Sequence, residues 1–419
     1  MHRRTICAAA LALAASAGAE PPGLELERLI EEALAANPGL KALEHRAAAA
    51  EARVPAAGAL QDPSLRLELS NVPFSPLSLD GSPMSGRQVT LSQKLPYPGK
   101  REARERAAFH AAEGASAARR ERELTVANMV KQAYFELAFL DRAIAIAERN
   151  RELLKDFVRI ARSKYSVARG PQQDVLKAQV SLSSLRDRLL MLEGQRRRTG
   201  AQLNAVLNRP PGEPVGRTPA IEPTPYDIDA ARLREIALGE RPLLNGLRAR
   251  RDRWRAAGEL ADRERRPDFE VSAAWRQRGF REDPVAGSDF FSAGVMLNLP
   301  VYQGRRQDLE VAAARAEVRA VEAELEAESR GLALQIEQLR IDAETHLREM
   351  ELFRGAIIPQ ADQSLAAAIA GYQVDEVDFL TLLDNQVTLL NFEIDYYRHL
   401  SQYEKTLARL ESVVGRRLF

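Results

Sequence analysis

The chain has 419 residues and is almost neutral, with 60 Lys and Arg residues against 59 Asp and Glu residues. This balance argues against a nucleic-acid-binding protein, and clusters such as Arg248 to Arg255 fit the solvated faces of helices. Beyond residue 19 there is no cysteine, which excludes disulfides, thiolate metal sites and a thiol nucleophile. No apolar run of roughly 18 or more residues follows either, so any membrane span has to be built from strands.

The first residues have the pattern of a secretory signal peptide. Arg3 and Arg4 precede an apolar run from Ile6 to Ala15, and small residues at 17–19 offer a cleavage site. We therefore expect residues 1–19 to be removed on export. The two arginines fit an ordinary basic start better than a twin-arginine signal, because that dipeptide alone is a weak motif.

The remaining chain is an internal duplication. Residues of the first half recur 204 residues later near the start of each repeat and 207 residues later near its end. The matching pairs include Leu29 and Leu233, Pro38 and Pro242, Pro63 and Pro267, Pro96 and Pro300, Tyr165 and Tyr372, and Gln179 and Gln386. A proline-rich segment at 209–226 separates the halves and is expected to be an extended linker. The sequence therefore predicts a first structural repeat at 20–208 and a second at 227–419.

Each repeat contains two segments in which apolar and polar residues alternate. In the first segment Leu65, Leu67 and Leu69 alternate with polar residues, and this period of two is typical of a strand. The predicted strands lie at about 63–72, 86–96, 267–277 and 290–300. The segments that join them are rich in Pro, Gly, Asp and Ser and are expected to be hairpin loops.

Helical periodicity fills the rest of each repeat. The predicted helices lie at about 40–61, 102–168 and 171–208 in the first repeat and at about 243–265, 306–372 and 378–414 in the second. Either of the two longest segments, if continuous, would be on the order of 100 Å long. Pro171 suits the first turn of a helix, so the chain is expected to reverse there. Pro359 predicts a kink near Ile357 and Ile358, because proline inside a helix costs about 3 kcal/mol or more.

Four strands with one apolar face need partners. In lipid, the two edges of such a sheet would leave backbone groups without hydrogen bonds, so other chains have to close it. Two copies would give about eight strands and three would give about twelve, which is wide enough for a lumen. Symmetric assembly is therefore predicted, while the choice between dimer and trimer stays open on this argument.

A basic segment follows the second strand of each repeat. The first reads Leu95-Pro96-Tyr97-Pro98-Gly99-Lys100-Arg101, and its counterpart runs from Leu299 through Pro300 and Gly304 to Arg305 and Arg306. We expect Pro96, Gly99, Lys100, Arg101, Pro300, Gly304, Arg305 and Arg306 to mark the junction between strands and helices. Their long basic side chains are expected to reach the inner lipid headgroups, with Tyr97 and Tyr302 at the interface.

The duplicated order of helix, strand, strand, very long helix, turn and helix resembles the outer-membrane factor (TolC-like) efflux family over the whole mature chain. The segment from Leu95 to Arg101 resembles its heavy-metal (CzcC-like) branch. The resemblance implies a mainly α protomer, a homotrimeric twelve-stranded β-barrel in the outer membrane of a Gram-negative cell, and a coiled-coil α-barrel that extends into the periplasm. It also implies a passive exit duct for heavy-metal cations, a periplasmic adaptor (membrane fusion) protein and an inner-membrane RND-type pump, with no catalysis and no cofactor.

The turns that end the long helices are expected to form the periplasmic aperture. The first turn offers Arg169 and Lys177, and the second offers Asp375, Glu376, Asp378 and Asp384. The resemblance implies an acidic ring at this entrance, with Asp384 at one of its positions, whereas Thr381 replaces the second acid. We expect Arg169 and Lys177 to pair with the acids of the other turn, in the same protomer or in its neighbour, and so to hold the aperture closed. The alternative is that the acids cap the last helix and interact with its N-terminus.

Other functions find less support in the sequence. The four histidines of the mature chain, His45, His110, His346 and His399, show no ligand spacing, so no metal site is expected. A secreted enzyme would need a set of catalytic groups that is not recognisable here. A periplasmic coiled-coil scaffold or adaptor would leave the four strands unexplained. A duct for drugs or for type I protein secretion is the nearest alternative, since it requires the same architecture.

Overall fold

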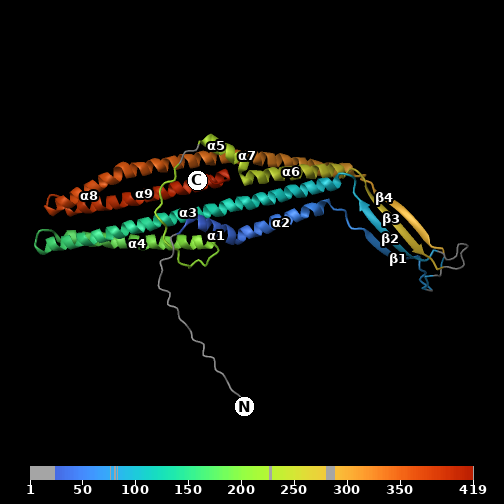
Figure 1. The fold of residues 1–419 in the computed structure, drawn as a ribbon, viewed down its shortest axis with the longest axis horizontal. Coiled ribbons are helices and arrows are strands. Elements are labelled where there is room, and N and C mark those ends of the chain that lie inside the picture. The colour runs from blue at the N-terminus through green and yellow to red at the C-terminus, as the bar shows by residue number, and fades with distance from the viewer. Residues whose placement is uncertain are drawn as a thin grey trace, which may run out of the picture.

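The protein is described here by a computed structural model. It covers residues 24–75, 77–79, 82, 84–225, 229–279 and 288–418. The expected signal peptide at 1–19 lies outside these residues, as do parts of both hairpin loops. The molecule is elongated, with its helices along one axis and a four-stranded sheet at one end (Figure 1). Within the described residues, no helix is both long enough and apolar enough to cross a lipid bilayer.

Each repeat contributes helices of very different lengths. The first repeat forms α1 (Leu26–Ala36), α2 (Pro38–Gly58), α3 (Lys100–Ser166) and α4 (Gln172–Val206), and the second forms α5 (Ala230–Glu240), α6 (Pro242–Arg263), α7 (Gln307–Leu352), α8 (Ile358–Gln373) and α9 (Phe379–Val414). With 67 residues, α3 is about 100 Å long at 1.5 Å per residue. Pro38 and Pro242 occupy the first turns of α2 and α6. An N–H in the first turn of a helix has no partner within the helix, so a proline there loses no hydrogen bond.

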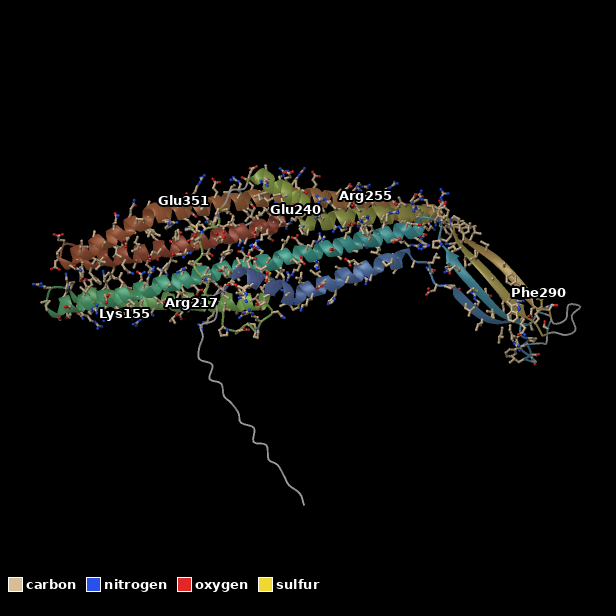
Figure 2. All side chains as sticks on the ribbon, viewed as in Figure 1. Lys155, Arg217, Glu240, Arg255, Phe290 and Glu351 are labelled. Atoms are coloured by element: carbon tan, nitrogen blue, oxygen red, sulfur yellow. The ribbon has the colours of Figure 1, made fainter. Side chains whose placement is uncertain are left out.

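The helices pack side by side in two hairpins. Helix α3 contacts α2 and α6 towards the sheet and α4 and α9 towards the opposite end, and α7 contacts α6 and α9. The turns that join α3 to α4 and α8 to α9 both lie at the end farthest from the sheet (Figure 1). The largest apolar cluster lies in this distal half and includes Phe157, Leu185, Leu382 and Ile394. The core therefore lies between the helices, and side chains with nitrogen and oxygen atoms cover much of the outer helix surface (Figure 2).

The second long helix is interrupted at the predicted kink. A π-helical turn at Phe353–Ile357 separates α7 from α8, and Pro359 lies in the first turn of α8. The backbone N–H of Ile358 donates to the carbonyl of Phe353, a bond that spans five residues instead of four. The wider turn accommodates the proline, which has no N–H to donate. The sequence located the irregularity correctly, but it did not predict this conformation.

The linker is attached to the helices. Its described part, 209–225, contains no helix or strand. The backbone N–H and hydroxyl of Thr218 each donate to Asp141 at 3.0 Å, and the backbone N–H of Thr224 donates to Glu404 at 2.7 Å. Burial raises the pKa of Glu404, although its hydrogen bonds from Thr224 work in the opposite direction. These hydrogen bonds hold the linker between the repeats against α3 and α9.

The four strands form one antiparallel sheet in the order β1-β2-β3-β4. Their bounds are β1 (Ser64–Ser70), β2 (Gly86–Leu95), β3 (Asp268–Gln277) and β4 (Phe290–Asn298). Strand β2 of the first repeat pairs directly with β3 of the second, with Leu95 opposite Phe269. The two repeats therefore share a continuous sheet, which leaves β1 and β4 as its edges.

Candidate functional site

One face of the sheet is predominantly apolar. The register aligns Leu67 with Val89, Val89 with Trp275, and Trp275 with Phe291, so residues of one face meet across all four strands. The apolar residues of this face are Leu65, Leu67, Leu69, Val89, Leu91, Leu95, Phe269, Val271, Ala273, Trp275, Phe291, Ala293, Val295 and Leu297. Gln93 lies among them, and Arg87 and Gln277 lie beside Leu69 at the loop end of the same face. Large side chains such as Leu67 (73% exposed) and Phe291 (75% exposed) lie open on the single chain. An apolar surface of this extent marks an interface with lipid or protein.

The opposite face is mostly polar, although Ala274, Phe290 and Met296 also lie on it. It carries Arg66 and Glu68 on β1, Thr90 and Lys94 on β2, and Ser272 on β3, among others. The outer edges of β1 and β4 pair with no other strand of the described chain. A sheet with one apolar face and one mostly polar face suits a position between lipid and water, where its two unpaired edges would need hydrogen-bond partners.

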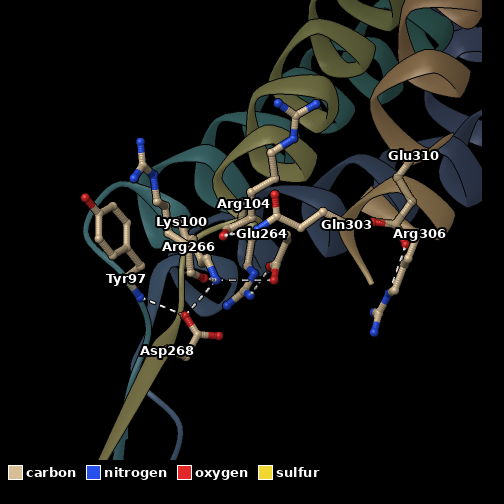
Figure 3. Close-up of polar contacts among 10 residues, drawn as sticks. Tyr97, Lys100, Arg104, Glu264, Arg266, Asp268, Gln303, Arg306 and Glu310 are labelled. Atoms are coloured by element: carbon tan, nitrogen blue, oxygen red, sulfur yellow. Dashed lines mark hydrogen bonds and ion pairs between the residues drawn. The ribbon is translucent and has the colours of Figure 1, made fainter. Parts of the chain in front are cut away.

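The junction between sheet and helices is built around Lys100. Its side chain, 1% exposed, donates to Asp268 at 2.8 Å, to Glu264 at 3.3 Å and to the carbonyl of Arg266 at 2.9 Å (Figure 3). Asp268 also accepts a hydrogen bond from the backbone N–H of Tyr97 at 2.8 Å. The network therefore connects the start of α3 with the segment between α6 and β3. The expectation that Lys100 reaches lipid headgroups is wrong, because these partners bury its ammonium group.

The other junction residues differ between the repeats. Gly99 adopts a left-handed backbone conformation (φ 86°) directly before α3, and a Cβ atom there would overlap the Arg263 guanidinium. Arg101 donates to the carbonyl of Gly58 at 2.7 Å and so fixes the end of α2. The second junction is more open, since a short 3-10 helix at Gln303–Arg305 contains Gly304 and no residue of that helix is buried.

Two of the predicted junction residues, Arg305 and Arg306, are exposed at the second junction. Arg306 immediately precedes α7 and contacts Glu310 in the first turn of that helix at 3.4 Å (Figure 3). Pro96 and Pro300 each follow the end of a strand. The eight predicted residues thus lie where the strands meet the helices. A role of Arg305 and Arg306 towards lipid stays a prediction.

The two distal turns repeat one backbone conformation. Ala168 (φ 59°) and Asp375 (φ 66°) both adopt left-handed conformations and lie 207 residues apart. In the first turn the N–H of Arg169 donates to the carbonyl of Lys164 at 2.8 Å, and in the second the N–H of Glu376 donates to Gly371 at 2.9 Å. The duplication therefore extends to the hydrogen bonds that close each helix.

An ion pair connects the two turns, although it is not the predicted one. Lys164 donates to the carbonyl of Tyr372 at 2.6 Å, forms an ion pair with Asp375, and lies 4.2 Å from the centre of the Tyr372 ring. The hydrogen bond and charge of Lys164 lower the pKa of Asp375, and the charge of Arg169 contributes to the same effect. Burial raises the pKa of Tyr372 to about 12. The sequence reasoning missed Lys164, which lies one turn before the predicted residues.

The remaining aperture residues have separate positions. Asp378 caps α9, since it accepts hydrogen bonds from the backbone N–H and the hydroxyl of Thr381, both at 2.9 Å. For Asp378 the capping alternative is therefore the one observed. Lys177 lies near Asp174 on its own helix, where burial raises the pKa of Asp174 and Lys177 opposes that effect. Glu376 and Asp384 are exposed, and whether they form a ring depends on other chains.

Helices α7 and α9 bring together two histidines and a glutamate. His346 Nδ1 lies 3.1 Å and His399 Nδ1 lies 2.7 Å from Glu349 Oε2, and the two Nδ1 atoms are 3.5 Å apart. Burial lowers the pKa of His399, although Glu349 acts in the opposite direction. Sequence reasoning expected no such cluster, because 53 residues separate the two histidines. The spacing of His346 and Glu349 by three residues was the one local signal.

Comparisons with known proteins agree with this geometry. A family model described as outer membrane efflux protein matches residues 29–209 and 233–416. The cobalt-zinc-cadmium resistance protein CzcC of Cupriavidus metallidurans is 24% identical over 245 residues, which are 58% of this chain and 53% of that protein. The match thus spans about half the length of this curated relative.

Solved structures share the fold over nearly the whole chain. The outer membrane protein VceC of Vibrio cholerae has a TM-score of 0.79 at 21% identity, covering 93% of this chain and 96% of VceC. CusC has a TM-score of 0.74 at 16% identity, covering 97% of this chain and 96% of CusC. Since the family model matches both repeats and most of the sequence, this chain belongs to the outer membrane efflux protein family.

Proposed function

We propose that this protein is the passive outer-membrane exit duct of a tripartite efflux system, with heavy-metal cations as its cargo. Three copies of the chain form the duct, a periplasmic adaptor docks to the helical end, and an inner-membrane RND-type pump supplies the cargo. The family and the fold are those of channels, not of enzymes. The proposal therefore assigns no catalytic group and no cofactor.

The four-stranded sheet is the observation that best supports the proposed duct. Its apolar face fits the hydrocarbon of a membrane, its polar face fits a water-filled lumen, and its two edges need further strands. Strands β2, β3 and β4 have 10, 10 and 9 residues, which suits this role because about 9 to 11 tilted residues cross the hydrocarbon, whereas β1 has only 7. Three copies give twelve strands, and a barrel of that size leaves a lumen, whereas eight strands are largely filled by side chains.

The metal cargo is supported by the relative and by the charge of the distal end. The similarity to a cobalt-zinc-cadmium resistance protein favours the heavy-metal branch. Glu376 and Asp384 are exposed at or near the turn after α8. A symmetric ring of such carboxylates would concentrate cations and repel anions at a narrow entrance.

The distal turns form the gate in this proposal. Lys164 and Asp375 connect the two hairpins of one protomer, and Arg169 adds positive charge beside Asp375. Asp384 supplies the carboxylate that narrows the lumen, and Lys177 contributes charge to the same region. An adaptor that competes for these side chains would release the hairpins and open the duct.

A mass measurement tests the assembly. The mature protein is expected to require detergent for extraction and to have the mass of three chains by light scattering. A monodisperse monomer in the absence of detergent would contradict the duct itself.

Metal tolerance of a deletion strain tests the cargo. Loss of the gene is expected to raise sensitivity to zinc, cobalt, cadmium, copper or silver salts more than sensitivity to large drugs. Wild-type protein and the polar-face variant Ser292→Arg should restore tolerance, whereas Val295→Arg, which places a charge on the apolar face, should not. Unchanged metal tolerance together with reduced drug tolerance would instead assign drug export.

A further inference from the structure

The cluster of His346, Glu349 and His399 lies away from both the sheet and the distal turns. Its residues come from α7 and α9, so it bridges two helices of the second repeat. His399 lies 20 residues after the start of α9, which places it roughly 30 Å from the distal turn at 1.5 Å per residue. Neither the proposed gate nor the junction uses these side chains.

We propose that His346, Glu349 and His399 bind one divalent transition-metal ion of the zinc class in each chain. Two imidazole nitrogens and one carboxylate oxygen form a ligand set that zinc and its neighbours prefer and that magnesium and calcium do not. A water molecule would complete a tetrahedral coordination. The ion would link α7 to α9 within the hairpin that carries the distal turn.

The distances between the ligand atoms fit such an ion. The three atoms form a triangle with sides of 2.7, 3.1 and 3.5 Å. A circle through them has a radius of about 1.8 Å, so an ion with bonds of about 2.0–2.1 Å would lie about 1 Å out of their plane. This is close to the position of a metal above three ligands of a tetrahedron. Binding therefore requires loss of the protons that these atoms share, while the separations of the ligand atoms already suit the ion.

The surroundings orient the ligands and leave an access path. The ring of Phe353 lies 5.4 Å from the His399 ring and 6.0 Å from the Phe392 ring, so aromatic contacts hold the imidazole in place. Phe353 is the first residue of the π-helical turn, and such turns are frequent at functional sites. The side chains of His346, Glu349 and His399 are 26%, 39% and 23% exposed, so an ion can reach them from solvent.

The ligand set is confined to the second repeat. Positions 204 to 207 residues before His346 and His399 hold no histidine. The first repeat does contain a pair with the same spacing, His110 and Glu113, at 2.7 Å. That pair lacks a histidine from a second helix, and it therefore provides a matched control within the same chain.

Zinc titration of the full-length protein in detergent, carrying a purification tag without histidines, tests the proposal. In competition with a chromogenic chelator we expect one tight zinc ion per chain, and excess magnesium should not displace it. The double variant His346→Gln/His399→Gln should lose at least about 100-fold in zinc affinity, whereas His110→Gln/Glu113→Gln should keep it. Cobalt(II) bound to the wild type should show the visible absorption of a tetrahedral nitrogen and oxygen site, and the double variant should lose that absorption.

Measurements of folding and thermal stability distinguish the loss of a metal ligand from a folding defect. Circular dichroism and oligomer mass should be the same for both double variants, and Glu349→Gln offers a milder change. Zinc should raise the melting temperature of the wild type, because the ion binds the folded state alone, and Glu349→Gln should reduce that increase. Equal zinc affinity in the wild type and in His346→Gln/His399→Gln would overturn the site. The proposal does not rest on the cargo of the duct, because binding by the purified protein is independent of metal tolerance in cells.

Discussion

Replacing Lys100 with methionine is expected to destabilise the junction between the sheet and the helices. Methionine has a similar length and fits an apolar space, but it removes the ammonium group that contacts Asp268, Glu264 and the carbonyl of Arg266. Breaking a buried ion pair by removing one partner costs roughly 3–5 kcal/mol. Both carboxylates are about one-third exposed, and water can hydrate them in the variant. We therefore expect the lower end of the range, about 3 kcal/mol.

The corresponding shift in melting temperature is measurable. Unfolding entropy is roughly 2.1 cal/mol/K per residue, so a folded chain of about 400 residues unfolds with about 0.8 kcal/mol/K. A loss of about 3 kcal/mol thus lowers the melting temperature by about 4 °C. Thermal melting followed by circular dichroism, at a fixed detergent and protein concentration, measures this shift.

A matched control lies six residues away. Lys94 is exposed on β2, so Lys94→Met makes the same chemical change without removing a buried charge and should cost less than about 0.5 kcal/mol. Adding Asp268→Asn to Lys100→Met should recover part of the loss, because it removes a carboxylate left without its cation. Equal melting temperatures for Lys100→Met and Lys94→Met would refute the structural role of this network.

Three further changes test other parts of the molecule. Gly99→Ala should cost about 1–2 kcal/mol or more, because it strains a left-handed residue and crowds an arginine, whereas Gly304→Ala at the repeat-equivalent position should have little effect in the same melting assay. Val295→Arg should cost about 2–4 kcal/mol on a face exposed to lipid and deplete the protein from outer-membrane fractions, and equal depletion by Ser292→Arg would contradict the assignment of the two faces. Asp375→Asn should raise the single-channel conductance in planar bilayers by removing the distal ion pair. Because the pKa of Asp375 is lowered, the wild-type pair should persist at neutral pH and weaken as the pH falls through that lowered pKa. A wild-type conductance that does not rise in this acid range would exclude a gating role of the pair.

Periodicity and composition were sufficient to predict the architecture. The period-two pattern of Leu65, Leu67 and Leu69 identified a strand, and comparable patterns identified the other three, because a strand must present alternate residues to its two faces. The long stretch without proline between 102 and 168 allowed one continuous helix, and α3 is that helix. Pro359 indicated the irregularity of the second long helix, because proline has no N–H and therefore removes a hydrogen bond within its own helix.

Contacts between distant residues required the tertiary structure. The sequence identified Lys100 and Asp375 as candidate site residues, but it did not identify their partners. Those partners lie between about 160 and 210 residues away in the chain, and charge alone does not select one oppositely charged residue among many. For this reason Lys100 is buried and does not extend towards lipid, and Lys164 contacts Asp375 where Arg169 and Lys177 were predicted. The same limit hid the cluster of His346 and His399, because side chains on separate helices meet through the packing of α7 against α9. The sequence by itself determined the elements and their amphipathic faces, which depend on neighbouring residues. The packing of the helices decided which side chains meet, because those contacts join residues that have no local relation.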